Sequence, residues 1–262
     1  MELKDIERVV IIGSGNLAEA LARAIAAADF CVAGIVARNK ERGQAVAQVV
    51  SAKWFSTADE APAADLYLIS VSDRSVGEVA DKLHVPAGAI VAHTAGCVAL
   101  DALAAHPLRA VFYPLMTFTK GRAVDFSDIP IFLECSTGNV DRVMGQFAEK
   151  ISATVDHADS ARRRKIHLAG VFANNFANHM FVLAEEVMGD AGLGFEVLKP
   201  IIRETAAKAC DAGSPRDVQT GPAVRGDRAS MYRHMELLEN KLLTQDIYTK
   251  ISQSIWETSK KI

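Results

Sequence analysis

A short glycine-rich segment near the start of the chain has the residue types that bind phosphate. The β-branched run Val9–Ile12 leads into Gly13–Ala18, GSGNLA, which fits the pattern G-x-G-x-x-A. Gly13 permits a tight turn, Gly15 leaves room for a pyrophosphate against the backbone, and Ala18 allows close packing of a helix on the strand. The amides at the start of that helix would face the phosphates. The pattern predicts a dinucleotide site with contacts at Gly13, Ser14, Gly15, Asn16 and Leu17.

The end of the next predicted strand indicates which dinucleotide binds. The apolar run Cys31–Ala37 continues into Arg38 and Asn39, at the place where an NAD site usually has Asp or Glu. A guanidinium binds a 2′-phosphate through two hydrogen bonds, whereas a carboxylate would repel it. We therefore expect NADP(H), with Arg38 on the phosphate and Asn39 as a second donor. The alternative is a solvated charged loop that opens a surface helix.

Polar residues also follow two later apolar strands. Ligands of a doubly wound sheet bind beyond the carboxyl ends of its strands, so these residues are candidates for the ribose and nicotinamide half of the cofactor. The expected contacts are at Val71, Ser72, Asp73, Thr94 and Ala95. Ordinary turn chemistry is the alternative, since Ser, Asp, Thr and Gly are good turn formers. His93 lies within an apolar strand and is expected to be structural.

A predicted long helix carries polar residues inside an apolar stretch. Asn174 and Asn178 are four residues apart, so they share a helix face, and His167 joins that face in a regular helix. Asn175 and His179 form the neighbouring face. The functional interpretation is a polar wall of an interdomain cleft, with Asn175 and His167 acting on the substrate. The alternative is hydrogen bonding between helices at a domain or dimer interface.

A rigid loop is the other polar concentration. Thr220-Gly221-Pro222 precedes Arg225, so a hydroxyl and a guanidinium lie near a helix start. Such a loop can bind an anionic substrate, and Thr220 is a third candidate catalytic residue. Alternatively, Thr220 only caps a turn. Earlier in the chain, the segment Tyr113–Phe118 follows another predicted strand. It is interpreted as one wall of a pocket or as a turn in the core.

The elements that must position these residues are alternating strands and helices in the first part of the chain and helices alone in the second. Strand and helix signals alternate up to about residue 155, which indicates an α/β fold with a doubly wound, mostly parallel Rossmann sheet. From residue 156 no strand is expected. Helices are predicted over 160–189, 196–212 and 228–240, and a last one begins at a Thr244 cap. We therefore expect a dinucleotide-binding domain, 1–155, and an all-helical dimerisation and substrate domain, 156–262.

Composition excludes several classes of protein. The 262 residues are 50% hydrophobic and 23% charged, with a net charge of −3, so nothing marks a nucleic-acid partner. The four cysteines form no C-x-x-C pair, and no zinc-type spacing of Cys and His is present, so we predict no metal site. No signal pattern or long apolar span occurs, and the expected location is the cytoplasm, away from membranes.

Several longer motifs resemble a known family. They are VVIIGSGNLA at 9–18, VARNK at 36–40, HTAG at 93–96, YPLMTF at 113–118, LAGVFANNFANH at 168–179 and TGPAVRGD at 220–227. The chain resembles the pyrroline-5-carboxylate reductase and coenzyme-F420-dependent NADP oxidoreductase type. More closely, it resembles a bacterial family that joins a Rossmann-like domain to a helical domain of unknown function. The resemblance implies NADP(H), a reductase-like cleft and a dimer, but no substrate. That family has His where this chain has Tyr113, so no acid role is carried to this position.

The residues and the resemblance lead to one main hypothesis. We expect an NADP(H)-dependent oxidoreductase that reduces a small carbonyl or imine substrate, which can be anionic. A non-catalytic NADP-binding sensor or scaffold and an F420-linked NADP oxidoreductase are the alternatives. The long helix is apolar around much of its circumference, as AGVFANNFANHMFVLA shows, so it needs several packing partners. We therefore expect a homodimer through the helical domain.

Overall fold

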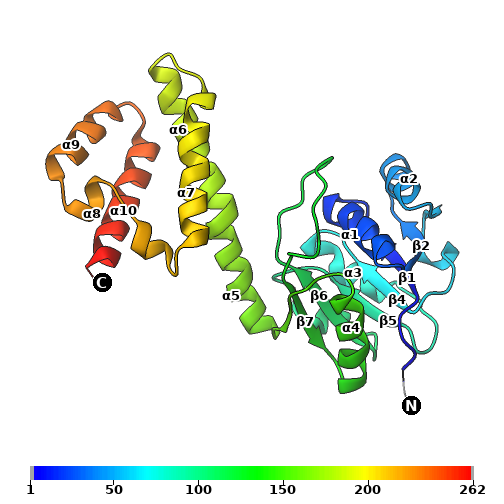
Figure 1. The fold of residues 1–262 in the computed structure, drawn as a ribbon. Helices are drawn as coiled ribbons and strands as arrows, with labels where there is room; N and C mark the ends of the chain where they lie inside the picture. The colour runs from blue at the N-terminus through cyan, green and yellow to red at the C-terminus, as the bar shows by residue number, and fades with distance from the viewer. Residues whose placement is uncertain (1–2, 261–262) are drawn as a thin grey trace. The chain divides into compact units, whose positions relative to one another are not determined.

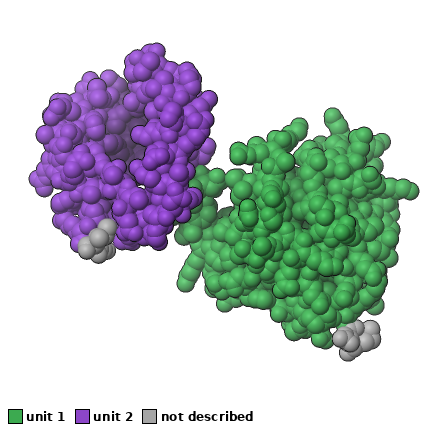
Figure 2. Space-filling view, viewed as in Figure 1, with its two compact units in different colours: residues 1–175 green, residues 176–262 purple. Residues whose placement is uncertain are grey.

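The computed structural model describes residues 3–260, and the chain divides into two compact units (Figure 2). Unit 1 is Met1–Asn175 and unit 2 is Phe176–Ile262. The boundary between these units lies inside the long helical stretch that follows the sheet. The division into functional domains at residues 155 and 156 stays a prediction.

Unit 1 is built on one eight-stranded sheet in the order β3-β2-β1-β4-β5-β6-β7-β8 (Figure 1). The strands are β1 (Arg8–Ile12), β2 (Cys31–Val36), β3 (Trp54–Phe55), β4 (Leu66–Ile69), β5 (Ile90–His93), β6 (Arg109–Pro114), β7 (Ile131–Cys135) and β8 (Val155–His157). Every neighbouring pair is parallel except β6 and β7. The first six strands follow the 3-2-1-4-5-6 order of dinucleotide-binding sheets, so the predicted mostly parallel Rossmann sheet is confirmed.

Helices cover both faces of this sheet because its strands are apolar on both sides. Unit 1 contains α1 (Asn16–Ala27), α2 (Lys40–Val49), α3 (Val76–Asp81), α4 (Gly138–Glu149) and α5 (Ser160–Gly170), and the short helices η1 (Ala58–Glu60), η2 (Asp73–Ser75) and η3 (Leu100–Leu103). Side chains of α1, α2 and α4 pack with Val9 and Ile11 on one face. Those of α3 and η3 pack with Val10 and Ile12 on the other. Alternating residues of β1 therefore enter two separate cores.

The strand register brings the predicted site residues to one edge. Ile12 at the end of β1 pairs with Val36 of β2 and with Ile69 of β4. Ile69 pairs in turn with His93 of β5, which pairs with Val111 of β6. The residues that follow these strands therefore emerge side by side along the carboxyl edge, where Rossmann sheets bind their ligands.

One strand was not expected from the sequence. β8 extends the sheet beyond residue 155, so the prediction of no strand after residue 156 is wrong. Its three residues include Asp156 and His157, which are exposed, and it pairs with β7 at the sheet edge. An edge strand this short and polar has no hydrophobic pattern to reveal it.

The predicted long helix is continuous but changes its pitch. It consists of α5, the π segment η4 (Val171–Phe176) and α6 (Ala177–Asp190). Asp159 caps its start by accepting a hydrogen bond from the Arg162 amide at 2.7 Å. A π segment of this kind is uncommon and often lies at functional sites.

Unit 2 is helical throughout the part that is described. It contains α6, η5 (Phe195–Leu198), α7 (Lys199–Asp211), η6 (Pro215–Val218), α8 (Pro222–Arg225), α9 (Arg228–Leu237) and α10 (Leu242–Ser259). Asp227 caps α9, because its side chain accepts a hydrogen bond from the Ser230 amide at 3.0 Å. The predicted cap at Thr244 is wrong, because α10 already begins at Leu242 after Lys241. Across residues 3–260, none of the helices has the length and apolar character needed to span a bilayer.

Candidate functional site

The glycine loop at the end of β1 is fixed by its backbone. Gly13 has φ of +132°, which side chains rarely tolerate, and a Cβ there would lie 2.0 Å from the carbonyl oxygen of Ser70. The Gly13 amide donates to the carbonyl of Val36 at 2.8 Å. The loop therefore turns sharply between the ends of β2 and β4, and only glycine fits at position 13.

Gly15 has a different reason to be glycine. It lies just before α1, with extended backbone angles, and a Cβ built on it would contact nothing within 4 Å. Open space at this position leaves room for a phosphate against the backbone. The first amides of α1 have no acceptor within the helix and lie at its positive end. The loop and the start of α1 fit the pyrophosphate of a dinucleotide.

Arg42 braces this loop and was missed by the sequence analysis. Its Nε donates to the Ser14 carbonyl at 3.0 Å, and its guanidinium forms an ion pair of 2.6 Å with Glu19 of α1. Burial would raise the pKa of Glu19, but the hydrogen bonds from Arg23 and Arg42 outweigh it and lower that pKa. Arg42 belongs to the basic run after β2, and nothing in the sequence distinguishes it from its solvated neighbours.

Arg38 and Asn39 follow β2, as expected, but they are not equivalent. Arg38 is exposed beyond the strand end. The pKa of Glu78 is lowered chiefly by Lys82 and to a smaller degree by the charge of Arg38. Asn39 caps α2, because its side-chain oxygen accepts from the Arg42 amide at 2.9 Å. Arg38 is therefore available to an anion, while one end of the Asn39 amide is already used.

The residues after β4 and β5 make ordinary turn contacts. The Ser72 hydroxyl lies 2.9 Å from that of Ser75, next to Asp73, which begins η2, and Val71 is half-buried. Thr94, which directly follows β5, is buried. Its hydroxyl lies 3.4 Å from the carbonyl of Ile69, the last residue of β4. Ala95 is also buried beside it. These residues line the same edge as the glycine loop, and their contact with a cofactor stays a prediction.

His93 is structural, as the sequence predicts. It is completely buried, and its Nδ1 accepts a hydrogen bond from the Ala95 amide at 3.2 Å. Burial, and then the positive charge of Arg163, lowers the pKa of His93 to about 4. The ring is therefore neutral near pH 7 and holds the turn after β5.

Tyr113 at the end of β6 is paired with a histidine. Its hydroxyl lies 3.0 Å from Nδ1 of His167, a residue of α5. Burial, followed by the nearby Cys97 and Asp73, raises the pKa of Tyr113 to about 12. Gly96 packs under the pair, since a Cβ there would lie 2.6 Å from Nδ1 of His167 and 3.0 Å from the Tyr113 ring. The arrangement supplies a protonated phenol next to an imidazole.

Comparison with known proteins identifies the family. A Rossmann-like domain model matches residues 4–112, and a model of a domain of unknown function, DUF2520, matches residues 129–255. A putative NADP oxidoreductase from Bacteroides fragilis is 36% identical, with 97% of this chain and 98% of that chain covered and a TM-score of 0.87. The chain belongs to this oxidoreductase family.

More distant structures share the fold of the family. An imine reductase from Pseudomonas sp. is 17% identical, covering 95% of this chain and 93% of that chain with a TM-score of 0.69. A pyrroline-5-carboxylate reductase from Coxiella burnetii is 13% identical, covering 98% of each chain with a TM-score of 0.58. The resemblance to this reductase type is confirmed at the level of fold. A comparison with curated proteins gave no match.

In this member of the family, the π segment changes which helix residues share a face. A π turn takes about one residue more than an α turn, so two turns that include it span about eight residues. His167 is therefore aligned with Asn175, so the prediction that His167 joins the face of Asn174 and Asn178 is wrong. The three asparagines, Asn174, Asn175 and Asn178, are all exposed. Asn175 lies on the helix face of His167, two turns farther along the helix.

Thr220 belongs to unit 2 of the family fold. It is exposed, its carbonyl accepts from the side-chain amide of Gln219 at 3.1 Å, and the following Gly221 has φ of +116°. Pro222 and Arg225 form the short helix α8. The catalytic role of Thr220 stays a prediction.

Proposed function

We propose that the protein is an NADP(H)-dependent oxidoreductase that reduces a small imine or carbonyl compound. The observation that carries the proposal is the order of groups along the carboxyl edge of the sheet. Arg38 follows β2, the glycine loop follows β1, and Tyr113 lies at the end of β6. A cation for the 2′-phosphate, a loop for the pyrophosphate and a proton donor therefore follow one another across the sheet, in the direction in which a bound dinucleotide would extend.

The cofactor would be held by residues at four strand ends. The glycine loop and the first amides of α1 would take the pyrophosphate, Arg38 the 2′-phosphate, and Ser72 with Ala95 the nicotinamide half. When bound, NADPH supplies the hydride. The protein's own contribution is then orientation and a proton.

We assign the proton to Tyr113, in hydrogen-bond contact with His167. A phenol with a pKa of about 12 stays protonated near pH 7 and can donate to a developing negative charge on the acceptor. An imidazole that donates from Nδ1 to the phenol oxygen would turn the phenol proton toward the substrate. Asn175 would orient the substrate from the same helix face, and Thr220 is kept as a candidate for an anionic group.

The proposal includes a homodimer through the helical half of the chain. Among residues 176–260 only Ala223, Leu238 and Ser252 are buried, which is too few for a hydrophobic core. Large apolar side chains such as Ile201, Leu242 and Leu243 are 63%, 72% and 74% exposed. A second copy of the chain would cover them.

We further propose that the protein works in a reducing compartment such as the cytoplasm. Cys31, Cys97, Cys135 and Cys210 are all free thiols, which are typical of proteins that work where thiols stay reduced.

Nicotinamide absorbance tests the proposal directly. Purified protein is first titrated with NADPH by calorimetry and then mixed with NADPH and a panel of cyclic imines, aldehydes and ketones. Oxidation of NADPH by an imine or carbonyl, absent in the Tyr113→Phe protein, is the expected result. Binding without oxidation by the panel would indicate a sensor, and oxidation only with coenzyme F420 would indicate an F420-linked enzyme; either result would replace the proposal. No binding of NADPH would overturn it.

A further inference from the structure

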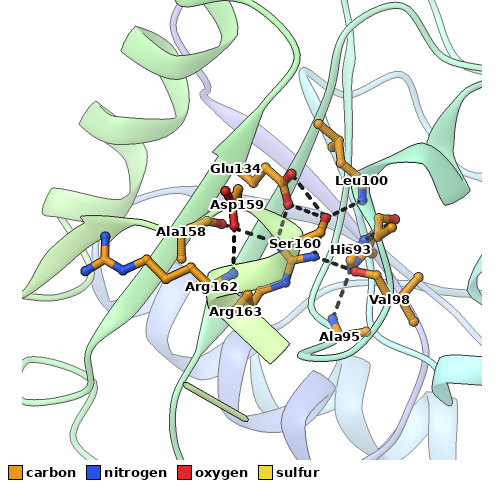
Figure 3. A network of polar contacts seen from close by, with 11 residues as sticks. His93, Ala95, Val98, Leu100, Glu134, Ala158, Asp159, Ser160, Arg162 and Arg163 are labelled. Atoms are coloured by element: carbon orange, nitrogen blue, oxygen red, sulfur yellow. Dashed lines mark hydrogen bonds and ion pairs between the residues drawn. The ribbon is translucent and has the colours of Figure 1, made fainter. Parts of the chain in front are cut away.

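A buried arginine at the start of α5 anchors that helix to the sheet (Figure 3). Arg163 is completely buried, and one of its terminal nitrogens forms an ion pair with Glu134 of β7. The other donates to the carbonyl of Val98 and lies 3.3 Å from the Ser160 hydroxyl. The guanidinium thus links α5, β7 and the loop that follows β5.

Ser160 closes the network on its other side. Its hydroxyl donates to Glu134 at 2.8 Å and accepts from the Leu100 amide at 3.3 Å. Figure 3 shows these groups converging between α5 and the loop after β5. Glu134 therefore receives hydrogen bonds from two residues of the first turn of α5, and Leu100 is held through one of them.

The same two segments meet again at the Tyr113–His167 pair. Arg163 and His167 are four residues apart on α5, so they lie on one helix face. Val98, which Arg163 holds, is two residues from Gly96, which packs against His167. Arg163 therefore holds the first turn of α5 against β7, and His167 lies on the next turn of the same helix. Arg163 also binds the loop after β5, whose Gly96 packs against His167.

Holding a helix with a buried ion pair has a free-energy cost. Burying two charges costs desolvation that their attraction does not always repay, and well-packed apolar residues often serve equally well. Within residues 3–260 the Nε of Arg163 also has no hydrogen-bond partner, although it is buried. What the ion pair adds over an apolar contact is direction, because its hydrogen bonds fix the rotation of α5 about its axis.

We propose that Arg163, held by Glu134, is a positioning residue that sets His167 against Tyr113. The inference rests on the proposed function for its catalytic meaning, since it assigns no contact between Arg163 and a substrate. Displacement of the imidazole by about 1 Å in a reacting site can cost about a hundredfold in rate.

The test replaces the ion pair by apolar residues of similar size. The double variant Glu134→Leu with Arg163→Met removes the directional hydrogen bonds but leaves the site filled. Arg162→Met is the matched control, because Arg162 is the neighbouring arginine on α5 and its partner Asp156 is at the surface, at 2.9 Å. The full chain with ¹⁵N-labelled histidine is used, and long-range ¹H–¹⁵N spectra record the ring nitrogens of His167, assigned with His167→Gln.

Tyr113→Phe defines the signal of a lost hydrogen bond at His167 Nδ1. We expect the double variant to shift this resonance as Tyr113→Phe does, and Arg162→Met to leave it in place. With pyrroline as the imine probe, we expect kcat to fall about a hundredfold in the double variant while the dissociation constant of NADPH stays near that of the wild type. An unmoved His167 resonance in the folded double variant, or an equal shift in Arg162→Met, would overturn the inference.

A milder variant keeps the inference testable if the double variant does not fold. Arg163→Met alone removes the hydrogen bonds of Arg163 and leaves the partly exposed Glu134 with the Ser160 hydroxyl, and a His167 resonance identical to wild type in that protein would also count against positioning. The spectra need no turnover. Wild-type protein that binds no NADPH therefore overturns the proposed function and leaves the positioning result to be judged separately.

Discussion

The Tyr113 hydroxyl and Nδ1 of His167 lie 3.0 Å apart, although the two residues are 54 positions apart in sequence. Their rings are 6.1 Å apart between centroids and are tilted by 55°. Gly96 lies against both, so nothing larger fits below them. The pair joins the end of β6 to α5.

Removing the Tyr113 hydroxyl should stop reduction without affecting cofactor binding. The Tyr113→Phe protein keeps the ring that packs near Phe132 but loses the proton donor. General acid catalysis contributes about a hundred- to ten-thousandfold, so kcat should fall in that range. Single-turnover absorbance measures the loss, and calorimetry measures NADPH binding in parallel. Wild-type kcat in Tyr113→Phe would rule out the phenol as the donor.

Arg38 should determine the preference for NADPH over NADH. A charge-assisted contact with the 2′-phosphate stabilises the complex by about 1.5–3 kcal/mol, or roughly ten- to a hundredfold in affinity. Arg38→Ala should lose that preference in calorimetric titrations. Lys40→Ala is the control, because Lys40 is the next cation along the chain and lies over the Trp54 ring at 5.9 Å. Equal affinity of the wild type for both cofactors would refute the assignment.

The two glycines of the loop should respond differently to substitution. Gly15→Val places its side chain in open space, so the fold should persist while the pyrophosphate is blocked and NADPH binding is abolished. Gly13→Ala puts a Cβ against the Ser70 carbonyl at positive φ, and should reduce the free energy of unfolding by at least about 2 kcal/mol. Urea unfolding and calorimetry separate the effects. Retained NADPH affinity in folded Gly15→Val would show that the phosphate binds elsewhere.

Protonation of His93 should weaken the fold in acid. Its pKa is about 4 in the folded chain and near 6.5 when unfolded, so the unfolded state binds more protons between these values. The stabilisation, about 3 kcal/mol, is complete above pH 6.5 and is lost as the pH falls toward 4. Urea unfolding at pH 5 and pH 7 should therefore differ less in His93→Gln than in the wild type. His84→Gln, with a side chain 84% exposed, should behave like the wild type.

Local patterns in the sequence account for the fold and for the glycine loop. The run from β1 to α1 was predictable because a buried strand, a glycine turn and a helix start must follow one another within a few residues. The predicted alternation of strands and helices is present through most of the sheet domain, and no helix lies among the described residues between β6 and β7. The π segment was not predictable, because one inserted residue does not change an apolar pattern enough to be read from it.

Contacts between distant segments explain what the sequence could not reveal. Arg163 lies in the run Arg162–Lys165, which has the composition of a solvated helix face, and only its meeting with Glu134 of β7 makes it internal. In the sequence, Tyr113 lies at a predicted strand end and His167 on a predicted helix. Their pairing depends on where α5 crosses the sheet, and no local signal encodes that position.

The exposed apolar residues of unit 2 lead to a prediction about assembly. With so few buried residues between 176 and 260, a folded monomer would leave large apolar side chains in water. Light scattering at micromolar concentration should give twice the 28.2 kDa of one chain. Ile201→Glu with Leu243→Glu should shift the protein toward monomer or unfold it, because each buried charge without a partner opposes association. Val49→Glu, at an apolar residue of α2 that is 37% exposed in unit 1, should leave the mass unchanged. A wild-type mass near 28.2 kDa would contradict the predicted homodimer.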